Sequence, residues 1–288
     1  MATIDTQYEV KVGSLDFSDI IAMENGYQWT IIAESAESAT GQDTTGKFRI
    51  PILGERVQLI FTSPEYIKVS RLKQFAQALK MGSKGQREVS VTYHDPFFGT
   101  ITHNFYCTNI PYIKERLPDP PHEYASGVKI QLASTSFMKR QVLNDTPKLP
   151  IITNPILAYE FKLNGKEFND VIAIDGFSSQ YIEQSLESQT GQTLDGKFHI
   201  PIIGGRTQIA IKAIEYLEVG RFRQLGKELK FGTVGERTTS VTYDDVVHGR
   251  TTQPFYCTTI TGYIQKLPDY PYHYIKDVTF QLAMKQFF

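Results

Sequence analysis

The stretch 90–99, SVTYHDPFFG, recurs 150 residues later as SVTYDDVVHG at 240–249. The match extends in both directions without a gap. Residues 37–133 align onto residues 187–283, and about 45 of the 97 aligned pairs are identical. Self-similarity over this length means that the chain carries two copies of one structural unit. We therefore predict two tandem domains, at 1–135 and 155–288, joined by a polar, proline-bearing linker at 136–154.

Composition favours a β-rich protein and argues against nucleic acid as its partner. The chain has 288 residues, so each copy is long enough to bury a core of its own. Aromatic residues make up 12%, mostly Phe and Tyr, which goes with β-structure. The 30 basic and 31 acidic residues nearly cancel, so composition provides no basic field for nucleic acid. No apolar run reaches the length of a membrane span, and no leader segment is expected at Met1.

Alternating apolar residues predict strands at 47–52 and 57–62 in the first copy, and 207–212 in the second copy matches 57–62. Pro51 lacks a backbone donor and suggests an edge strand. Between the two strands, Gly54-Glu55 in the first copy and Gly204-Gly205 in the second are expected to form a tight turn. The side chains expected to face inward are Leu59, Phe61, Ile209 and Ile211.

One helix is predicted next in each copy. Ser63 is a good N-cap, and Pro64 suits the first helical position, so we expect the helix to begin there. Gly82 ends it in the first copy and Gly232 in the second. The apolar stripe that should pack on a sheet consists of Val69, Leu72, Phe75, Ala76 and Leu79, and of Val219, Phe222, Leu225 and Leu229 in the second copy.

Further strands are predicted after the helix. They cover 89–93 and 105–108, with a turn at 95–99 between them, and a last strand at 128–132 follows a rigid excursion at 117–121. The fold class is therefore mainly β (α+β), with two tandem antiparallel β-sandwich or barrel domains, each carrying one packed helix.

This order of elements resembles the tail-tube domain of long-tailed and contractile phages and of related injection machines. The run 90–99, followed by 105–108 and 124–132, is similar to small tail or baseplate proteins from phages of Gram-positive hosts. The resemblance spans most of both copies, and its matching residues are turn and core residues. The second copy departs from it at Asp245-Val246, where the proline is missing.

The resemblance implies a domain that forms sixfold rings around a channel by joining sheets edge to edge between subunits. Two such domains in one chain would permit a trimer with pseudo-sixfold symmetry, which we favour, or a hexamer of two stacked rings. The expected role is structural, in the tail tube or in the baseplate hub or distal tail junction of a virion assembled in the host cytoplasm, in contact with other tail and baseplate proteins. The alternative is a tail-tip binding module for a cell-surface polymer or a partner protein.

Two features suggest surfaces for this assembly. The helix residues Arg71 and Gln74 point away from the apolar stripe and still recur, and the hairpin tips carry adjacent apolar residues. Common descent or a solvated helix face could also explain why the helix residues recur. The apolar tips could instead fold back on their own domain. The predicted interface residues are Arg71, Gln74, Phe97, Phe98, Arg221, Gln224, Val246 and Val247.

The sequence shows no arrangement that predicts chemistry. Asp244, Asp245 and His248 could bind a metal, but the first copy does not repeat the set, and a turn acid explains Asp245 more simply. Cys107 and Cys257 occupy one repeat position and are expected to be buried thiols, with a bridge between them as the alternative. We expect no catalytic residue, metal, cofactor or enzymatic activity. The sequence does not exclude a pair of catalytic carboxylates, because the two members of such a pair need not be close in sequence.

Overall fold

The structure is a computed structural model. It describes residues 9–36, 41–42, 48–85, 87–117, 122–138, 140–143, 160–185, 191–192, 198–199, 202–266, 273–286 and 288.

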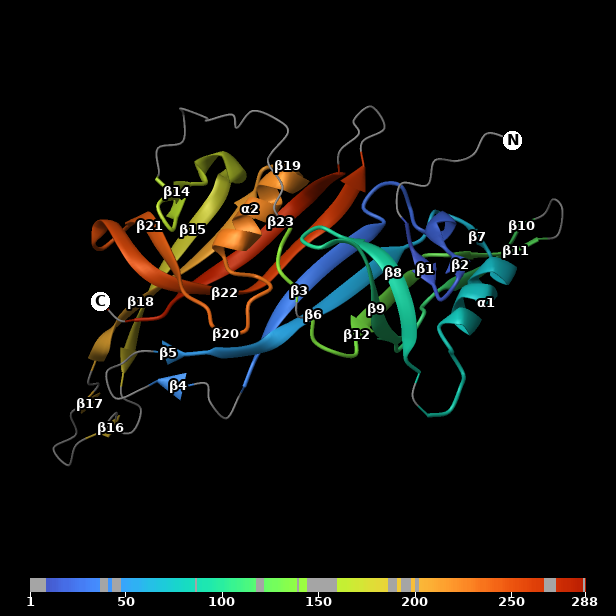
Figure 1. The fold of residues 1–288 in the computed structure, drawn as a ribbon, viewed down its shortest axis with the longest axis horizontal. Coiled ribbons are helices and arrows are strands. Elements are labelled where there is room, and N and C mark those ends of the chain that lie inside the picture. The colour runs from blue at the N-terminus through green and yellow to red at the C-terminus, as the bar shows by residue number, and fades with distance from the viewer. Residues whose placement is uncertain are drawn as a thin grey trace.

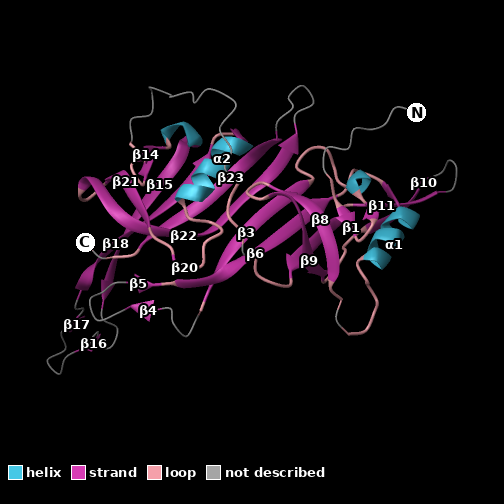
Figure 2. Cartoon of the chain, in the orientation of Figure 1, coloured by secondary structure: helices cyan, strands magenta, loops and turns pink. Residues whose placement is uncertain are grey.

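The two copies fold into matching series of elements (Figures 1 and 2). A short 3-10 turn stands near the start of each copy, at Ser18–Ile20 and Asn169–Val171. The first copy contains β1 (Lys11–Val12), β2 (Leu15–Asp16), β3 (Tyr27–Ser35), β4 (Gly41–Gln42), β5 (Phe48–Arg49), β6 (Pro51–Thr62), β7 (Ile67–Lys68), α1 (Val69–Ala78), β8 (Val89–Asp95), β9 (Gly99–Cys107), β10 (Ile113–Leu117), β11 (His122–Ser126) and β12 (Lys129–Ser134). The second contains β13 (Lys162–Leu163), β14 (Lys166–Glu167), β15 (Ile172–Ser185), β16 (Gly191–Gln192), β17 (Phe198–His199), β18 (Ile202–Ala213), β19 (Tyr216–Glu218), α2 (Val219–Glu228), β20 (Gly235–Glu236), β21 (Thr239–Asp245), β22 (Gly249–Lys266) and β23 (His273–Met284).

Strand order is the same in both copies. The first copy runs β3-β6-β12-β9-β8-β1-β2, and the second runs β15-β18-β23-β22-β21-β13-β14, with antiparallel neighbours throughout. The mainly β fold with one helix per copy is therefore confirmed. The two sheets are also joined, because β3 of the first copy pairs with β22 of the second. Both copies thus share one continuous sheet.

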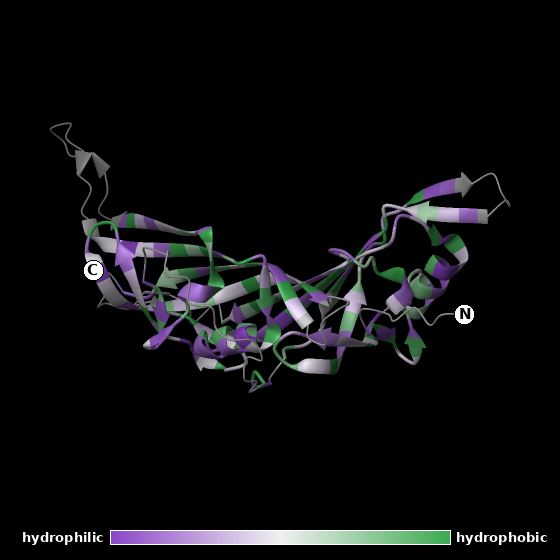
Figure 3. Ribbon diagram, turned by 90° about the horizontal axis from the view of Figure 1, so that it is seen from above, coloured by the Kyte–Doolittle hydropathy of each residue, from purple (hydrophilic) through white to green (hydrophobic). Residues whose placement is uncertain are grey.

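The joined sheet curves into an arch (Figure 3). Both helices lie in front of the sheet in Figure 1, which is the convex side in Figure 3. They cover a core that includes the residues expected to face inward, since Leu59, Phe61, Ile209 and Ile211 are all buried. The strand residues of the opposite face alternate with this core and keep much of their surface open, as at Gln131, Gln208 and Gln281.

The tight turns expected at Gly54-Glu55 and at Gly204-Gly205 are wrong, because β6 and β18 run through them without reversing. Instead, the pairing of β3 with β6 shifts by one residue between Glu34 and Ser35, opposite Gly54, as in a β-bulge. A Cβ at Gly54 would meet the Cβ of Phe137 at 2.5 Å, so close packing of an aromatic side chain explains the glycine. Nor does Pro51 mark a free edge, since it pairs with Glu236 of β20.

The helix begins later than its sequence signals indicated. Ser63 and Pro64 lead instead into a short strand, β7, and α1 begins at Val69 with Lys68 in the cap position. The hydroxyl of Ser63 donates a hydrogen bond to the carbonyl of Pro64 rather than accepting one from the helix. Pairing of β7 with β11 holds this segment extended, so a tertiary contact overrides the local capping pattern.

Part of the predicted linker belongs to the packed structure. Met138 and Val142 are buried, and the backbone N–H of Met138 donates to the carbonyl of Glu55. The excursion expected at 117–121 lies mostly outside the described residues, as do 144–154 of the linker. The limits predicted for the two domains therefore stay a prediction.

Both cysteines are free and buried, as the sequence predicted. Burial raises the pKa of the Cys107 thiol, and it raises that of Cys257 to about 12. A thiol reagent at pH 8 should therefore label neither residue in the native protein and both after unfolding in denaturant, as counted by mass spectrometry. Rapid labelling of the native chain would contradict this packing.

Candidate assembly interface

The central feature of the molecule is the joint between its two copies. Strand β3 pairs antiparallel with the second part of β22, with Ile32 opposite Thr259 and Gln28 opposite Tyr263. At the middle of this ladder the hydroxyl oxygens of Thr30 and Thr261 lie 2.7 Å apart. The joint thus extends a backbone ladder from one copy to the other, as edge strands readily do.

The hairpin tip of the first copy packs against α2 of the second. The ring of Phe97 stacks on Phe222 with centroids 4.7 Å apart and lies 5.4 Å from Phe231. Trp29 meets the same ring edge-on at 5.3 Å. Gly226 leaves the room that Phe97 needs, because a Cβ there would overlap the ring. Stacked and edge-on aromatic pairs of this kind add about 0.5–1.5 kcal/mol beyond their buried area.

Asp95 shapes this tip. Its carboxylate accepts hydrogen bonds from the backbone N–H groups of Phe97 and Phe98 at 2.9 and 3.0 Å, and from the indole N–H of Trp29 at 2.9 Å. The joint buries it completely. This burial raises the pKa of Asp95 to about 7, even though the three donors favour its charged form.

Three polar contacts secure the joint. Glu55 of β6 forms an ion pair with Arg237 at 2.6 Å and accepts a hydrogen bond from the N–H of Gly232, and the side chains of both ions are about 2% exposed or less. Arg223 of α2 donates to the carbonyl of Pro96 at 2.7 Å. Burial raises the pKa of Glu55, while the charge of Arg237 opposes that shift. Removing one partner from such a buried pair costs about 3–5 kcal/mol.

The hairpin tip of the second copy has the same turn but leaves its two valines open, while His248 of this turn stacks on Phe288 with ring centroids 3.7 Å apart. Val246 is 79% exposed and Val247 59%. Burial disfavours the charge of Asp245, but hydrogen bonds from the N–H groups of Val247 and His248 and from the hydroxyl of Thr207 outweigh it and lower its pKa to about 2. The two turns thus differ mainly at one repeat position, because Phe97 packs against the other copy whereas Val247 is open.

Among the predicted interface residues, the tips give two different results. Phe97 is fully buried and Phe98 is 7% exposed, so the expectation of an exposed pair in the first copy is wrong, because this tip is covered by α2 of the same chain. Val246 and Val247 are exposed, as expected. Phe97 therefore lies at an interface between the copies, and a contact with another chain stays a prediction for the second tip.

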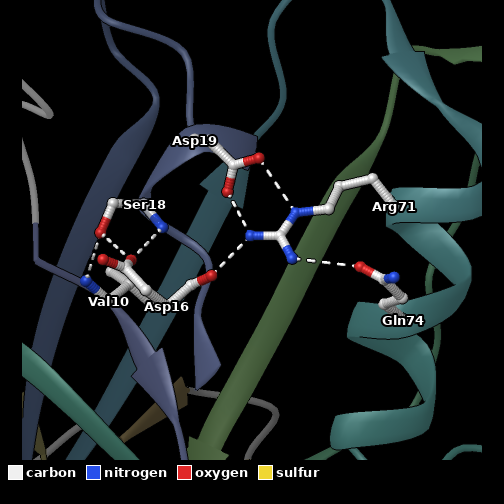
Figure 4. Close-up of polar contacts among 6 residues, drawn as sticks. All are labelled: Val10, Asp16, Ser18, Asp19, Arg71 and Gln74. Carbon is white, nitrogen blue, oxygen red and sulfur yellow. Dashed lines mark hydrogen bonds and ion pairs between the residues drawn. The ribbon is translucent and has the colours of Figure 1, made fainter. Parts of the chain in front are cut away.

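The recurring helix residues make the same contacts inside each copy. The guanidinium of Arg71 donates to both carboxylate oxygens of Asp19, at 3.0 and 2.6 Å, and to Gln74 at 3.2 Å (Figure 4). Arg221 repeats this pattern with Asp170 and Gln224. An internal role is enough to explain why these residues recur. Their role in an interface between chains stays a prediction.

Sequence reasoning missed the ion pair of the joint. Its signal is a break in the repeat, because Glu55 aligns with Gly205 while Arg237 aligns with Arg87. A charge kept in one copy and deleted in the other marks a position where the two copies have different neighbours. Trp29, expected in the core or an interface, is buried and belongs to both.

No grouping of three His, Cys, Asp or Glu that could hold a metal ion occurs among the residues that the structure describes. The same part of the chain contains no helix long and apolar enough to cross a membrane. Comparisons of the sequence with protein-family models and with curated proteins found no match.

Truncating a side chain at the two hairpin tips should affect the stability of the protein very differently. Replacing Phe97 by Ala should lower the free energy of unfolding by about 3–5 kcal/mol, because it empties the aromatic contact with α2. The matched substitution Val247→Ala should change the stability of the dilute chain by less than about 0.5 kcal/mol, because this side chain is exposed. Urea unfolding of both variants measures the difference, and equal losses would contradict the joint.

The two turn carboxylates predict opposite pH dependences. The folded pKa of Asp95 lies above its unfolded value, so its contribution to stability should fall as pH rises from about 4 to about 7. The folded pKa of Asp245 lies below its unfolded value, so its contribution should be lost as pH falls from about 4 to about 2. The stability difference between wild type and Asp95→Asn should therefore vary only in the higher window, and that for Asp245→Asn only in the lower, as urea titrations across pH would show.

Proposed function

We propose that this protein is a structural component of the tail of a phage or phage-like particle, in which copies of the chain assemble into a ring around the tail channel. The observation that carries this proposal is the joint itself. Two homologous units in one chain already build a single curved sheet by pairing edge to edge.

A joint of this kind is heterologous, because it uses a different surface on each unit. Repeating one heterologous contact generates a closed ring when the rotation closes, and a filament when it does not. Closure requires a joined sheet that curves, and the joined sheet in Figure 3 forms an arch. With two units per chain, three chains would form a ring of six units, which is the arrangement we favour over six chains in two stacked rings.

The open face of the sheet fits the lining of a passage. It lies on the concave side, away from the helices (Figure 3). A depression of about 590 Å³ on the second copy is lined in part by polar side chains, among them Ser178, Thr261, Thr279 and Gln281, together with the charged Asp175 and Lys212. These hydroxyl, amide and charged groups would keep the surface of a passage hydrated.

The position in the particle follows from the resemblance of the repeat to tail-tube domains. It favours the tube, or the baseplate hub or distal tail junction, with other tail and baseplate proteins as neighbours. A purely structural role agrees with an interface whose buried carboxylates serve the turns and the joint.

A tail-tip module that binds a cell-surface polymer stays the alternative. Binding of the purified protein to a glycan array, with no rings, would favour it.

Electron microscopy and mass photometry of the purified protein test the ring. We expect closed rings with pseudo-sixfold symmetry and a mass of three times the 32.7 kDa chain. Six times that mass with two layers would favour the stacked arrangement. A monodisperse monomer at high concentration, together with the absence of this protein from rings in the assembled particle, would contradict the proposal.

A further inference from the structure

We infer that the sheet continues from one chain to the next through one defined strand pair. In this pair, residues 109–113 of the first copy run antiparallel to residues 178–182 of the second copy of a neighbouring chain, and Val246 and Val247 of that neighbour pack on α1. The inference deepens the proposed ring and rests on it, because it names the surfaces at which separate chains meet.

The register follows from the internal joint. In that joint Thr259 lies opposite Ile32, Thr261 opposite Thr30 and Tyr263 opposite Gln28. The repeat relates β3 to β15 by the same shift of 150, since Tyr27 pairs with Phe61 where Phe177 pairs with Ile211. Applying this shift to both strands places Asn109 opposite Ile182, Pro111 opposite Gln180 and Ile113 opposite Ser178.

Both strands of this pair lie at open edges in the described chain. In the second copy, 258–262 belong to β22 and are held on one side by β3. The corresponding residues 108–112 of the first copy belong to no strand, and Tyr112 and Ile113 are 53% and 64% exposed. On the neighbour's side, β15 pairs with β18, and no other described strand pairs with it. Pairing would therefore give 108–112 the extended form that the second copy already shows.

The helix surfaces show the same contrast between covered and open. On α2, which the first copy covers, Arg223 and Gly226 are buried. On α1, the corresponding Lys73 is exposed and Ala76 is partly exposed. The same helix face is thus buried on α2, where a hairpin tip packs on it, and exposed on α1, where no hairpin tip of the described chain packs.

The side chains at the two joints differ in size in a compensating way. In the internal joint the large Phe97 packs where Gly226 leaves room for it. In the proposed joint a smaller residue, Val247, would meet a larger one, Ala76. The exchange of Phe and Gly for Val and Ala keeps the summed volume of the contact similar, which is the condition for tight packing.

The proposed joint lacks several contacts of the internal one. Gly205 and Arg87 replace the buried ion pair of Glu55 and Arg237, and Ser179 replaces Trp29. Pro111 also has no N–H to donate to the ladder. The joint between chains should therefore be the weaker of the two, so a ring would separate into intact chains before the two copies of a chain separate.

Engineered disulfides test the register. Pro111 and Gln180 correspond to Thr261 and Thr30, whose hydroxyl oxygens are 2.7 Å apart. The variant Pro111→Cys/Gln180→Cys should therefore form disulfides between chains on oxidation, giving a ladder on a non-reducing gel that stops at the closed ring. Pro111→Cys/Ser179→Cys should not, because a shift of one residue turns the second side chain to the other face. Thr30→Cys/Thr261→Cys is the positive control and should close within one chain. The native cysteines are buried and should not interfere.

A charge at the tip tests the contact with α1. Val247→Arg, introduced into the Pro111→Cys/Gln180→Cys chain, should lower cross-linking by at least about tenfold, because an unpaired charge would be buried in the joint. Ile174→Arg is the matched control. Ile174 is 79% exposed, and its counterpart Met23 in the first copy is 64% exposed, so cross-linking should be unchanged. Circular dichroism and the thermal midpoint should show that both variants fold.

The outcomes separate this inference from the proposed function. Rings without Pro111–Gln180 cross-links, while the positive control closes, would overturn the joint and leave the ring standing. A ladder that continues without an end would support the joint and contradict closure. Chains that stay monomeric under oxidation at high concentration, while the positive control closes, would overturn the joint. The proposed ring would fall as well if this protein is also absent from rings in the assembled particle.

Discussion

The structure depends on a single contact, in which the edge strand β3 of the first copy joins the sheet of the second. An unpaired edge strand presents a row of N–H and C=O groups that a second strand can satisfy. Here a homologous unit in the same chain satisfies them. Because the contact uses one edge of each unit, it leaves the opposite edges, at 108–113 and β15, at the two ends of the molecule.

The joint also explains why the two copies have diverged where they have. Positions that keep each unit folded recur, such as Arg71 and Arg221 with their acidic partners. Several positions at the joint differ, such as Glu55 and Gly205, because in the first copy they pack against the second copy of the same chain. Where a joint residue recurs, its surroundings differ instead. Asp95 and Asp245 show the consequence most clearly. Both cap the same hairpin turn, but the pKa of one is raised to about 7 and that of the other lowered to about 2.

Two features could not be predicted from the sequence because, like the joint, they depend on contacts between residues that are distant in the chain. A glycine that follows a run of alternating apolar residues predicts a turn, and Gly54 fits that pattern. The structure gives a different reason for this glycine, because the side chain of Phe137 packs where a Cβ would lie. Ser63 and Pro64 carry good signals for the start of a helix, but β11 pairs with the residues that follow and delays α1. In both cases a contact distant in sequence outweighed a preference worth about 1 kcal/mol.

The sequence by itself determined that two copies of a mainly β unit exist, which strand residues face inward, and that a helix accompanies each. Those features follow from the regular spacing of apolar residues along strands and helices. This spacing is present in one copy and recurs in the other. Only the tertiary structure decided that Phe97 is covered and Val247 is open, although the two occupy one repeat position. The reason is physical. Whether a residue at the edge of a unit is buried depends on which other surface packs against it. When two units are joined through one edge of each, the other edge of each unit is left without a partner in the same joint.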